Sequence, residues 1–380
     1  MIPFKPFIRL GVLFLLRKDV IRREKPKFSL KPPAVTCLLV LFCICVVFSI
    51  GCVSHNPPVN NEVPSSGFTN ITVTDSLNNT YSFSKPVERI VALNLDTIET
   101  LIVLGAGDQV VGVPQSILEK TNLKQYLPNA VNVGESGSPN VEKITELHPD
   151  VIILMNTAGE TEKTKFSILN VPVLSYNCYI FSELPSSVKN LGILTGKNEN
   201  ASLYLTFFYQ QDEMIQNRIT SIGNEKQPDV YLEIGSEYTA AGKESGGDSL
   251  LSHMKANNVA SNLPTQWPKV TPEWVVKTNP AFIIKTVHTY VGEEKDFVKI
   301  LSDLKSRAGF SEIDACSQNR TYVITSNFLY GPKGIIGQAL LGKILYPEMF
   351  SDIYLDDLIS RYEGLFNVKI DEKEVVFPNI

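Results

Sequence analysis

Apolar and polar positions follow two different periods along the body of the chain. Short apolar runs such as RIVAL (89–93), DVIIL (150–154) and AFIIKT (281–286) predict buried strands. Between such runs, segments like 140–147, with apolar residues at 141, 144 and 147, predict short amphipathic helices. Strands that alternate with helices predict a parallel sheet covered on both of its faces.

This alternation occurs twice, with a helical stretch between the two series. The first series opens with ITVTD and TYSF, which flank Ser76–Asn79 and predict a β-hairpin. The middle stretch predicts one helix to about residue 194 and a long helix over 198–222. We therefore predict an α/β fold of two β/α lobes joined by one long α-helix. The predicted boundaries are an N-lobe at 70–184, a helical connector at 185–227 and a C-lobe at 228–380.

The first 69 residues carry targeting signals. A basic stretch and an uncharged run from Ala34 to Gly51 precede Cys52, which predicts a signal segment over 1–52. The sequence Ser49-Ile50-Gly51-Cys52 resembles a lipoprotein cleavage box, although Ser49 stands where Leu or Val is usual. We predict Cys52 as a lipid anchor, with an uncleaved signal anchor as the alternative. Pro, Asn and Ser in 53–69 predict a flexible tether. The body is then expected outside the cell membrane, anchored to its outer face.

Charge and cysteine content narrow the class of protein. The 380 residues carry a net charge of −5, which argues against nucleic acid as a partner, because backbone binding needs a concentrated basic face. Only Cys178 and Cys316 lie in the body, so two isolated thiols are expected, with a single bridge as the alternative. The chain has no Gly-x-Gly-x-x-Gly, Walker, Gly-x-Ser-x-Gly or His-Glu-x-x-His motif, which favours a non-enzyme.

Two stretches carry a family resemblance. PVERIVALNLDTIETLIVLGAGDQVVGV with GESGSPNVEKITELHPDVIIL resembles the N-lobe of periplasmic-binding proteins for iron-siderophores, haem and cobalamin. YTAAGKESGGDSLLSHMKANNVASNLPTQWPKVTPEWVVKTNPAFIIK is similar to their C-lobe, and the likeness covers about residues 70 to 350. It implies two Rossmann-like lobes with a ligand cleft between them.

The resemblance also implies a function. The protein would capture an iron chelate, haem or a corrinoid and deliver it to an ABC importer, made of a permease dimer and its ATPase subunits. We expect a monomer without catalytic residues, resident metal or cofactor. A tethered metal-chelate enzyme, or a sensor on the same fold, is the alternative.

Ligand contacts are expected at the carboxyl ends of the strands, between the lobes. Trp267 stands where the cobalamin binders carry a stacking Trp, whereas Ser136 replaces an aromatic residue in the N-lobe. Lys243 and Lys285 are lone charges that we expect on solvated faces, so the pocket should suit a neutral or weakly charged chelate. The candidate residues are Asn94, Thr97, Gln115, Ser136, Asn156, Tyr238, Trp267, His288, Tyr290 and Tyr330.

Two acids occupy matching positions. Glu142 and Glu273 each lie in the first turn of a predicted helix, the second with Thr271 as N-cap and Pro272 at the first helical position. In the family these acids resemble the pair that docks onto permease arginines, one from each lobe. The alternative is that they only complement the helix dipole.

Overall fold

The computed structural model describes residues 70–380, except 156–158, 224–225, 289–295, 371–375 and 379–380. The chain from residue 64 onward forms one compact unit. The predicted signal segment, the predicted tether and Cys52 lie outside the described residues. None of the helices in the described part is both long and apolar enough to cross a bilayer.

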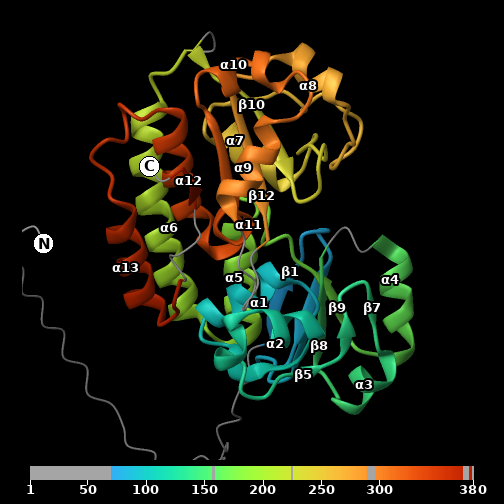
Figure 1. Ribbon diagram of the computed structural model, residues 1–380. Helices are drawn as coiled ribbons and strands as arrows, with labels where there is room; N and C mark the ends of the chain where they lie inside the picture. The colour runs from blue at the N-terminus through green and yellow to red at the C-terminus, as the bar shows by residue number, and fades with distance from the viewer. Residues whose placement is uncertain (1–69, 156–158, 224–225, 289–295, 371–375, 379–380) are drawn as a thin grey trace, which may run out of the picture. The chain divides into compact units, whose positions relative to one another are not determined.

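The first half of the unit is built on a parallel sheet (Figure 1). The predicted hairpin is confirmed, because β1 (Ile71–Thr74) pairs antiparallel with β2 (Thr80–Phe83). The sheet that follows has the strand order β5-β4-β3-β8-β9 and is parallel throughout. Its strands are β3 (Ile90–Ala92), β4 (Val110–Val113), β5 (Val131–Asn132), β8 (Val151–Leu154) and β9 (Val173–Ser175).

Both faces of this sheet are covered, as the apolar runs predict. Ile90 and Ala92 join a hydrophobic cluster on one face, whereas Val91 joins another that contains Ile144 and Phe166. Successive side chains of a strand point to opposite faces, so continuous apolar runs serve both clusters. The helices of this half are α1 (Leu95–Val103), α2 (Gln115–Lys120), α3 (Val141–Glu146), α4 (Gly159–Phe166) and α5 (Leu184–Thr195), and a small ribbon pairs β6 (Gly134–Glu135) with β7 (Ser138–Pro139).

The second half is built on another five-stranded sheet, with the order β11-β10-β12-β13-β14. The first four strands are parallel and β14 is antiparallel. The strands are β10 (Asp229–Ile234), β11 (Asn257–Asn258), β12 (Phe282–Val287), β13 (Thr321–Thr325) and β14 (Val376–Phe377). The helices are α7 (Gly246–His253), α8 (Pro272–Thr278), α9 (Phe297–Lys305), α10 (Asp314–Ser317) and α11 (Ser326–Leu329), followed by the 3-10 turn η7 (Gly331–Lys333).

The predicted long helix is present as α6 (Asn198–Ile219) and ends three residues before the predicted end. Its 22 residues span roughly 33 Å at 1.5 Å per residue. It packs against α12 (Gly334–Leu345), and both run beside α13 (Leu355–Phe366) (Figure 1). The ring of Phe207 in α6 contacts the ring of Phe366 in α13. The helix is therefore one member of a helical layer, to which the end of the chain contributes two further helices. The predicted lobe boundaries and the cleft between lobes stay predictions.

Candidate ligand-binding site

Each parallel sheet has a point where the chain changes direction across the sheet. In the first sheet, β3 lies in the centre, β4 and β5 extend to one side, and β8 and β9 extend to the other. In the second, β10 is flanked by β11 on one side and β12 on the other. Loops that leave two adjacent strands in opposite directions open a crevice at their carboxyl ends, where α/β proteins bind ligands.

Asn94 and Thr97 follow β3 at the first of these points. The Asn94 side chain caps α1 by accepting a hydrogen bond from the Thr97 backbone N–H at 2.9 Å. Its Nδ2 group is buried and has no partner among the described residues. Thr97 is fully buried, and its hydroxyl donates to Cys178 Sγ at 3.6 Å. The Asn94 side chain thus has a donor available for a ligand, whereas the Thr97 hydroxyl is buried and already bonded to Cys178.

Gln115 and Ser136 lie further along the same half. Gln115 begins α2 directly after β4, and its Nε2 donates to Glu119 Oε1 at 2.8 Å. Ser136 is exposed in the turn between β6 and β7. Gln115 shares the carboxyl edge with Asn94, because β4 is the neighbour of β3. Ser136 lies on the two-stranded β6–β7 ribbon, which is separate from the five-stranded sheet.

His288 follows β12 at the carboxyl edge of the second sheet, as predicted. Its Nδ1 lies 2.7 Å from Ser326 Oγ and 3.5 Å from Asn327 Oδ1, and these two residues begin α11 directly after the adjacent strand β13. The imidazole is exposed, so these contacts fix its orientation while leaving it accessible. Ser326 escaped the sequence analysis, since nothing in the local pattern links residues 288 and 326.

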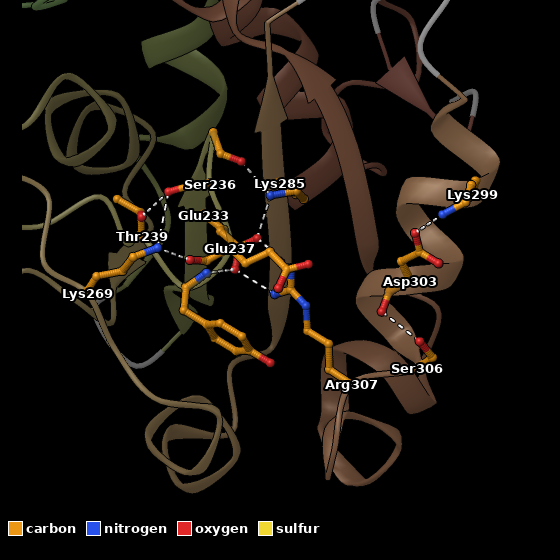
Figure 2. A network of polar contacts seen from close by, with 12 residues as sticks. Glu233, Ser236, Glu237, Thr239, Lys269, Lys285, Lys299, Asp303, Ser306 and Arg307 are labelled. Atoms are coloured by element: carbon orange, nitrogen blue, oxygen red, sulfur yellow. Dashed lines mark hydrogen bonds and ion pairs between the residues drawn. The ribbon is translucent and has the colours of Figure 1, made fainter.

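A buried ionic network lies beside β10 and β12, which carry Glu233 and Lys285 at paired positions (Figure 2). The Glu233 side chain is fully buried and accepts from Lys285 Nζ at 2.7 Å and from both terminal nitrogens of Arg307 at 2.7 and 3.1 Å. The expectation of a solvated Lys285 is therefore wrong: the lysine is buried because a carboxylate on the next strand neutralises it.

The Glu233 carboxylate is ionised although it is buried. Burial alone would raise the pKa of Glu233, but hydrogen bonds and charges from Arg307 and Lys285 bring the pKa below its usual value. The carboxylate therefore stays ionised at neutral pH. We call Glu233, Lys285 and Arg307 the Glu233 network.

Tyr238 contacts the Glu233 network directly. Its backbone N–H donates to Glu233 Oε2 at 2.7 Å, and its ring centroid lies 4.6 Å from the Arg307 guanidinium carbon. The residue has φ of 58°, in the left-handed region. Tyr238 thus has a structural role that the sequence analysis missed, beside the ligand contact predicted for it.

Trp267 and Tyr330 are the remaining aromatic candidates. Trp267 is 44% exposed, an unusual state for so large an apolar side chain. Tyr330 is partly buried, and its hydroxyl has no partner among the described residues. Burial raises the pKa of Tyr330 well above its usual range, so the hydroxyl remains protonated and can donate a hydrogen bond.

An acidic cluster at the start of α1 was not predicted. Lys333 of η7 pairs with Glu99 at 2.6 Å, and both side chains are largely buried. Asp96 lies on the same helix near Gly331, and burial together with the Glu99 charge raises the pKa of Asp96 to about 7. Sequence alone gave no signal, because residues 99 and 333 are far apart in the chain.

Glu142 and Glu273 have the helix positions predicted for them. Asn140 caps α3 by accepting from the Lys143 N–H at 2.9 Å, and Thr271 caps α8 by accepting from the Trp274 N–H at 3.2 Å. Both glutamates are exposed in the first turn. Hydrogen bonds from its own backbone N–H and from the Thr271 hydroxyl lower the pKa of Glu273.

Some predictions fall outside the described part. Asn156, Tyr290 and Cys52 are among the residues that the structure does not describe. Within residues 70–380, apart from the gaps, no group of three or more His, Cys, Asp or Glu is arranged to hold a metal ion. Cys178 and Cys316 are free thiols, the first buried and the second partly buried, as expected.

Known proteins share this fold and sequence pattern. Residues 90–328 match the family described as periplasmic binding protein. An uncharacterized ABC transporter substrate-binding lipoprotein of Bacillus subtilis, YvrC, is 27% identical over 74% of this chain and 87% of its own length. A cobalamin-binding protein of Halobacterium salinarum is 23% identical over 66% of this chain and 68% of its own. The molybdate-bound MolA of Haemophilus influenzae has a TM-score of 0.67 at 19% identity, covering 79% of this chain and 99% of that one, which shows the fold alone.

Proposed function

This chain belongs to the periplasmic binding protein family, and on that premise we propose that it captures an iron chelate or a corrinoid for an ABC importer. The observation that carries the proposal is the family match over residues 90–328, which spans both parallel sheets from β3 to β13. The role of substrate-binding component of an ABC transporter agrees with the name of YvrC.

Polar groups at the sheet edges support a ligand site there. Asn94 Nδ2 and the Tyr330 hydroxyl are buried groups whose hydrogen bonds no described residue completes. An unmet buried donor costs about 1–3 kcal/mol, so such groups are retained where a ligand or an ordered water completes them. Both residues are candidates chosen from sequence.

The charges at the second sheet favour a neutral or weakly charged ligand. Lys285 and Arg307 both pair with Glu233, and Arg307 Nη2 also lies 3.6 Å from Glu237 Oε1, so two carboxylates balance the two cations. Exposed Trp267 and His288 instead offer an aromatic face and an imidazole. An aromatic face packs well on a large flat or amphipathic chelate and poorly on a small oxyanion.

A binding titration tests this proposal directly. Full-length protein in mild detergent is titrated with cyanocobalamin, a ferric hydroxamate, haemin and molybdate, followed by tryptophan fluorescence and calorimetry. We expect one-to-one binding of at least one metal chelate, without chemical change in it. Tight binding of molybdate alone would replace the proposed ligand class, and a chemically altered product would favour an enzyme.

Docking to the transporter is the second part of the proposal. Substrate-binding proteins of ABC importers act with a permease and an ATPase, and we propose that Glu142 and Glu273 meet permease arginines. Exposed carboxylates in matching first turns suit bidentate guanidinium contacts. The acids also complement the dipoles of α3 and α8, so only an uptake measurement separates the two roles.

Location follows from the same family. Periplasmic binding proteins are extracytoplasmic, and YvrC is named a lipoprotein. We propose that Cys52 carries a lipid that anchors this chain to the outer face of the cell membrane. Metabolic labelling with a palmitate analogue should mark the wild type and leave Cys52→Ala unlabelled, whereas equal labelling of both would contradict the assignment.

A further inference from the structure

The loop that follows β10 turns back on its own strand. Ile234 N–H donates to Thr239 O at 2.8 Å and Ala241 N–H donates to Leu232 O at 2.8 Å, so residues 239–241 run beside 232–234. The residues at the bend, 235–238, are called the 235–238 turn. The turn emerges at the carboxyl end of β10, where Gly235 N–H donates to Thr286 O on β12 at 3.2 Å. It therefore lies at the point where the second sheet changes direction.

The Glu233 network holds both ends of this turn. Lys285 Nζ donates to Gly235 O at 2.9 Å, and the Tyr238 N–H donates to Glu233 Oε2 at 2.7 Å. Gly235 and Tyr238 have φ values of 60° and 58°. Left-handed backbone costs a non-glycine residue about 1–2 kcal/mol, so Tyr238 keeps it only because surrounding contacts compensate.

A second loop is built on the first. Lys269 Nζ donates to Glu237 O at 2.5 Å and to Ser236 Oγ at 3.3 Å. The Val270 N–H donates to Tyr238 O at 2.9 Å, and the Ala240 N–H donates to Pro268 O at 3.0 Å. These bonds tie the segment 266–270, which carries the exposed Trp267, to the turn. The position of Trp267 consequently depends on the turn, and the turn depends on Glu233.

The cost of burying these charges indicates that the Glu233 network positions the turn and does not act through stability alone. A buried carboxylate with two buried cations loses hydration that its pairing regains only partly, and apolar residues of similar volume often give equal or greater stability. The Glu233 carboxylate accepts five hydrogen bonds, including one from the Tyr231 hydroxyl at 3.2 Å and one from the turn itself. An apolar substitute would provide no acceptor for the Tyr238 N–H.

We propose that Glu233, with Lys285 and Arg307, is a positioning group that holds the 235–238 turn and the Trp267 segment as one platform for the ligand. This inference rests on the proposed function, because a platform needs a ligand. Glu233 itself is fully buried and does not touch the ligand. Its effect passes through the backbone of the turn to the exposed indole.

The test compares Glu233→Gln with a control that is destabilised elsewhere. Phe207→Ala removes a buried ring of α6 that packs on α13, away from the two loops. Arg307→Lys is a milder variant, which keeps the charge but loses the two-pronged contact and serves if Glu233→Gln does not fold. Each variant is measured for unfolding in denaturant, for amide hydrogen exchange of peptides covering 235–241 and 266–270, and for affinity.

Affinity is measured with cyanocobalamin and a ferric hydroxamate as probes. We expect Glu233→Gln to bind about tenfold more weakly and to exchange about tenfold faster in both peptides, with Arg307→Lys intermediate. Phe207→Ala should keep wild-type affinity and exchange there despite its lower stability. Affinity and exchange in Glu233→Gln that match the control would overturn the proposal.

The two hypotheses fail in different ways. If the wild type binds neither probe and does not bind haemin, the proposed ligand class fails, while the exchange comparison still decides whether Glu233 holds the two loops. If the wild type binds a probe and Glu233→Gln binds it equally well, the positioning role fails and the proposed function stands.

Discussion

Asp96, near the start of α1, has an unusual pKa. Asp96 is partly buried beside Glu99 and the Lys333 ammonium, and burial raises its pKa from 3.8 to about 7. The folded chain thus binds a proton at Asp96 that the unfolded chain releases above pH 4. Stability contributed by this group is present at low pH and is lost as the pH rises towards 7.

The first prediction concerns Asp96→Asn. The wild type should lose on the order of 2 kcal/mol of unfolding free energy between pH 5 and pH 8 through this group, because each pKa unit corresponds to about 1.4 kcal/mol. The variant should lack that decline and be the more stable protein at pH 8. Urea unfolding at a series of pH values measures it, and parallel pH profiles for the two proteins would refute the assignment.

Two helical glycines make a matched pair for a second prediction. A Cβ at Gly342 in α12 would lie 2.4 Å from the Phe350 ring, whereas a Cβ at Gly364 in α13 would meet nothing within 4 Å. Gly342→Ala should therefore cost about 1–3 kcal/mol through overpacking. Gly364→Ala should stabilise by about 0.5–1 kcal/mol, since alanine favours the helix. Thermal unfolding of both variants measures the difference, and equal effects would contradict the packing described.

Helix caps are the part of the elements that sequence determines most directly. Asn140 and Thr271 were followed by first-turn acids in the sequence, and both side chains cap their helices in the structure. Such caps need only residues two or three positions away. The packing partners of α6 were not accessible by the same reasoning, because the contacts Tyr204–Pro332 and Phe207–Phe366 join residues more than a hundred positions apart.

A third prediction follows for α8. Thr271→Ala removes the acceptor for the Trp274 N–H and the hydroxyl that bonds Glu273, so it should cost about 1 kcal/mol and raise the Glu273 pKa. Thr271→Ser keeps both groups and is the control. Denaturant unfolding and carboxyl NMR titration measure the two effects. A variant as stable as the control, with an unchanged Glu273 titration, would show that the cap is not formed.

At the level of the complete protein, transport requires both ligand capture and docking. Glu142→Ala, Glu273→Ala and the double variant should keep ligand affinity, because both acids are exposed in first turns rather than at the strand ends. Uptake by cells that carry the cognate importer should fall at least tenfold in the double variant. Glu146→Ala, an exposed acid at the end of α3, is the matched control. Lost affinity, or undiminished uptake, would contradict the docking role.

The sequence by itself determined the local features of this protein. Apolar runs and turn residues set the order of strands and helices, the β1–β2 hairpin and the long α6, because these depend on neighbours within a few positions. The repeated alternation of strands and helices predicted the two β/α lobes, and the family motifs agreed with it. The end of α6 and the helix α13 were harder to predict from sequence. Fraying and tertiary packing, rather than the local apolar pattern, determine where such helices form and end.

Only the tertiary structure decided which distant groups meet. Lys285 looked solvated because its partner Glu233 lies 52 positions earlier, and only strand pairing puts the two charges side by side. The Glu99–Lys333 pair and the dependence of the Trp267 segment on the 235–238 turn arose in the same way. A charge can be buried only where another charge compensates it, and that partner is found by folding rather than by local sequence.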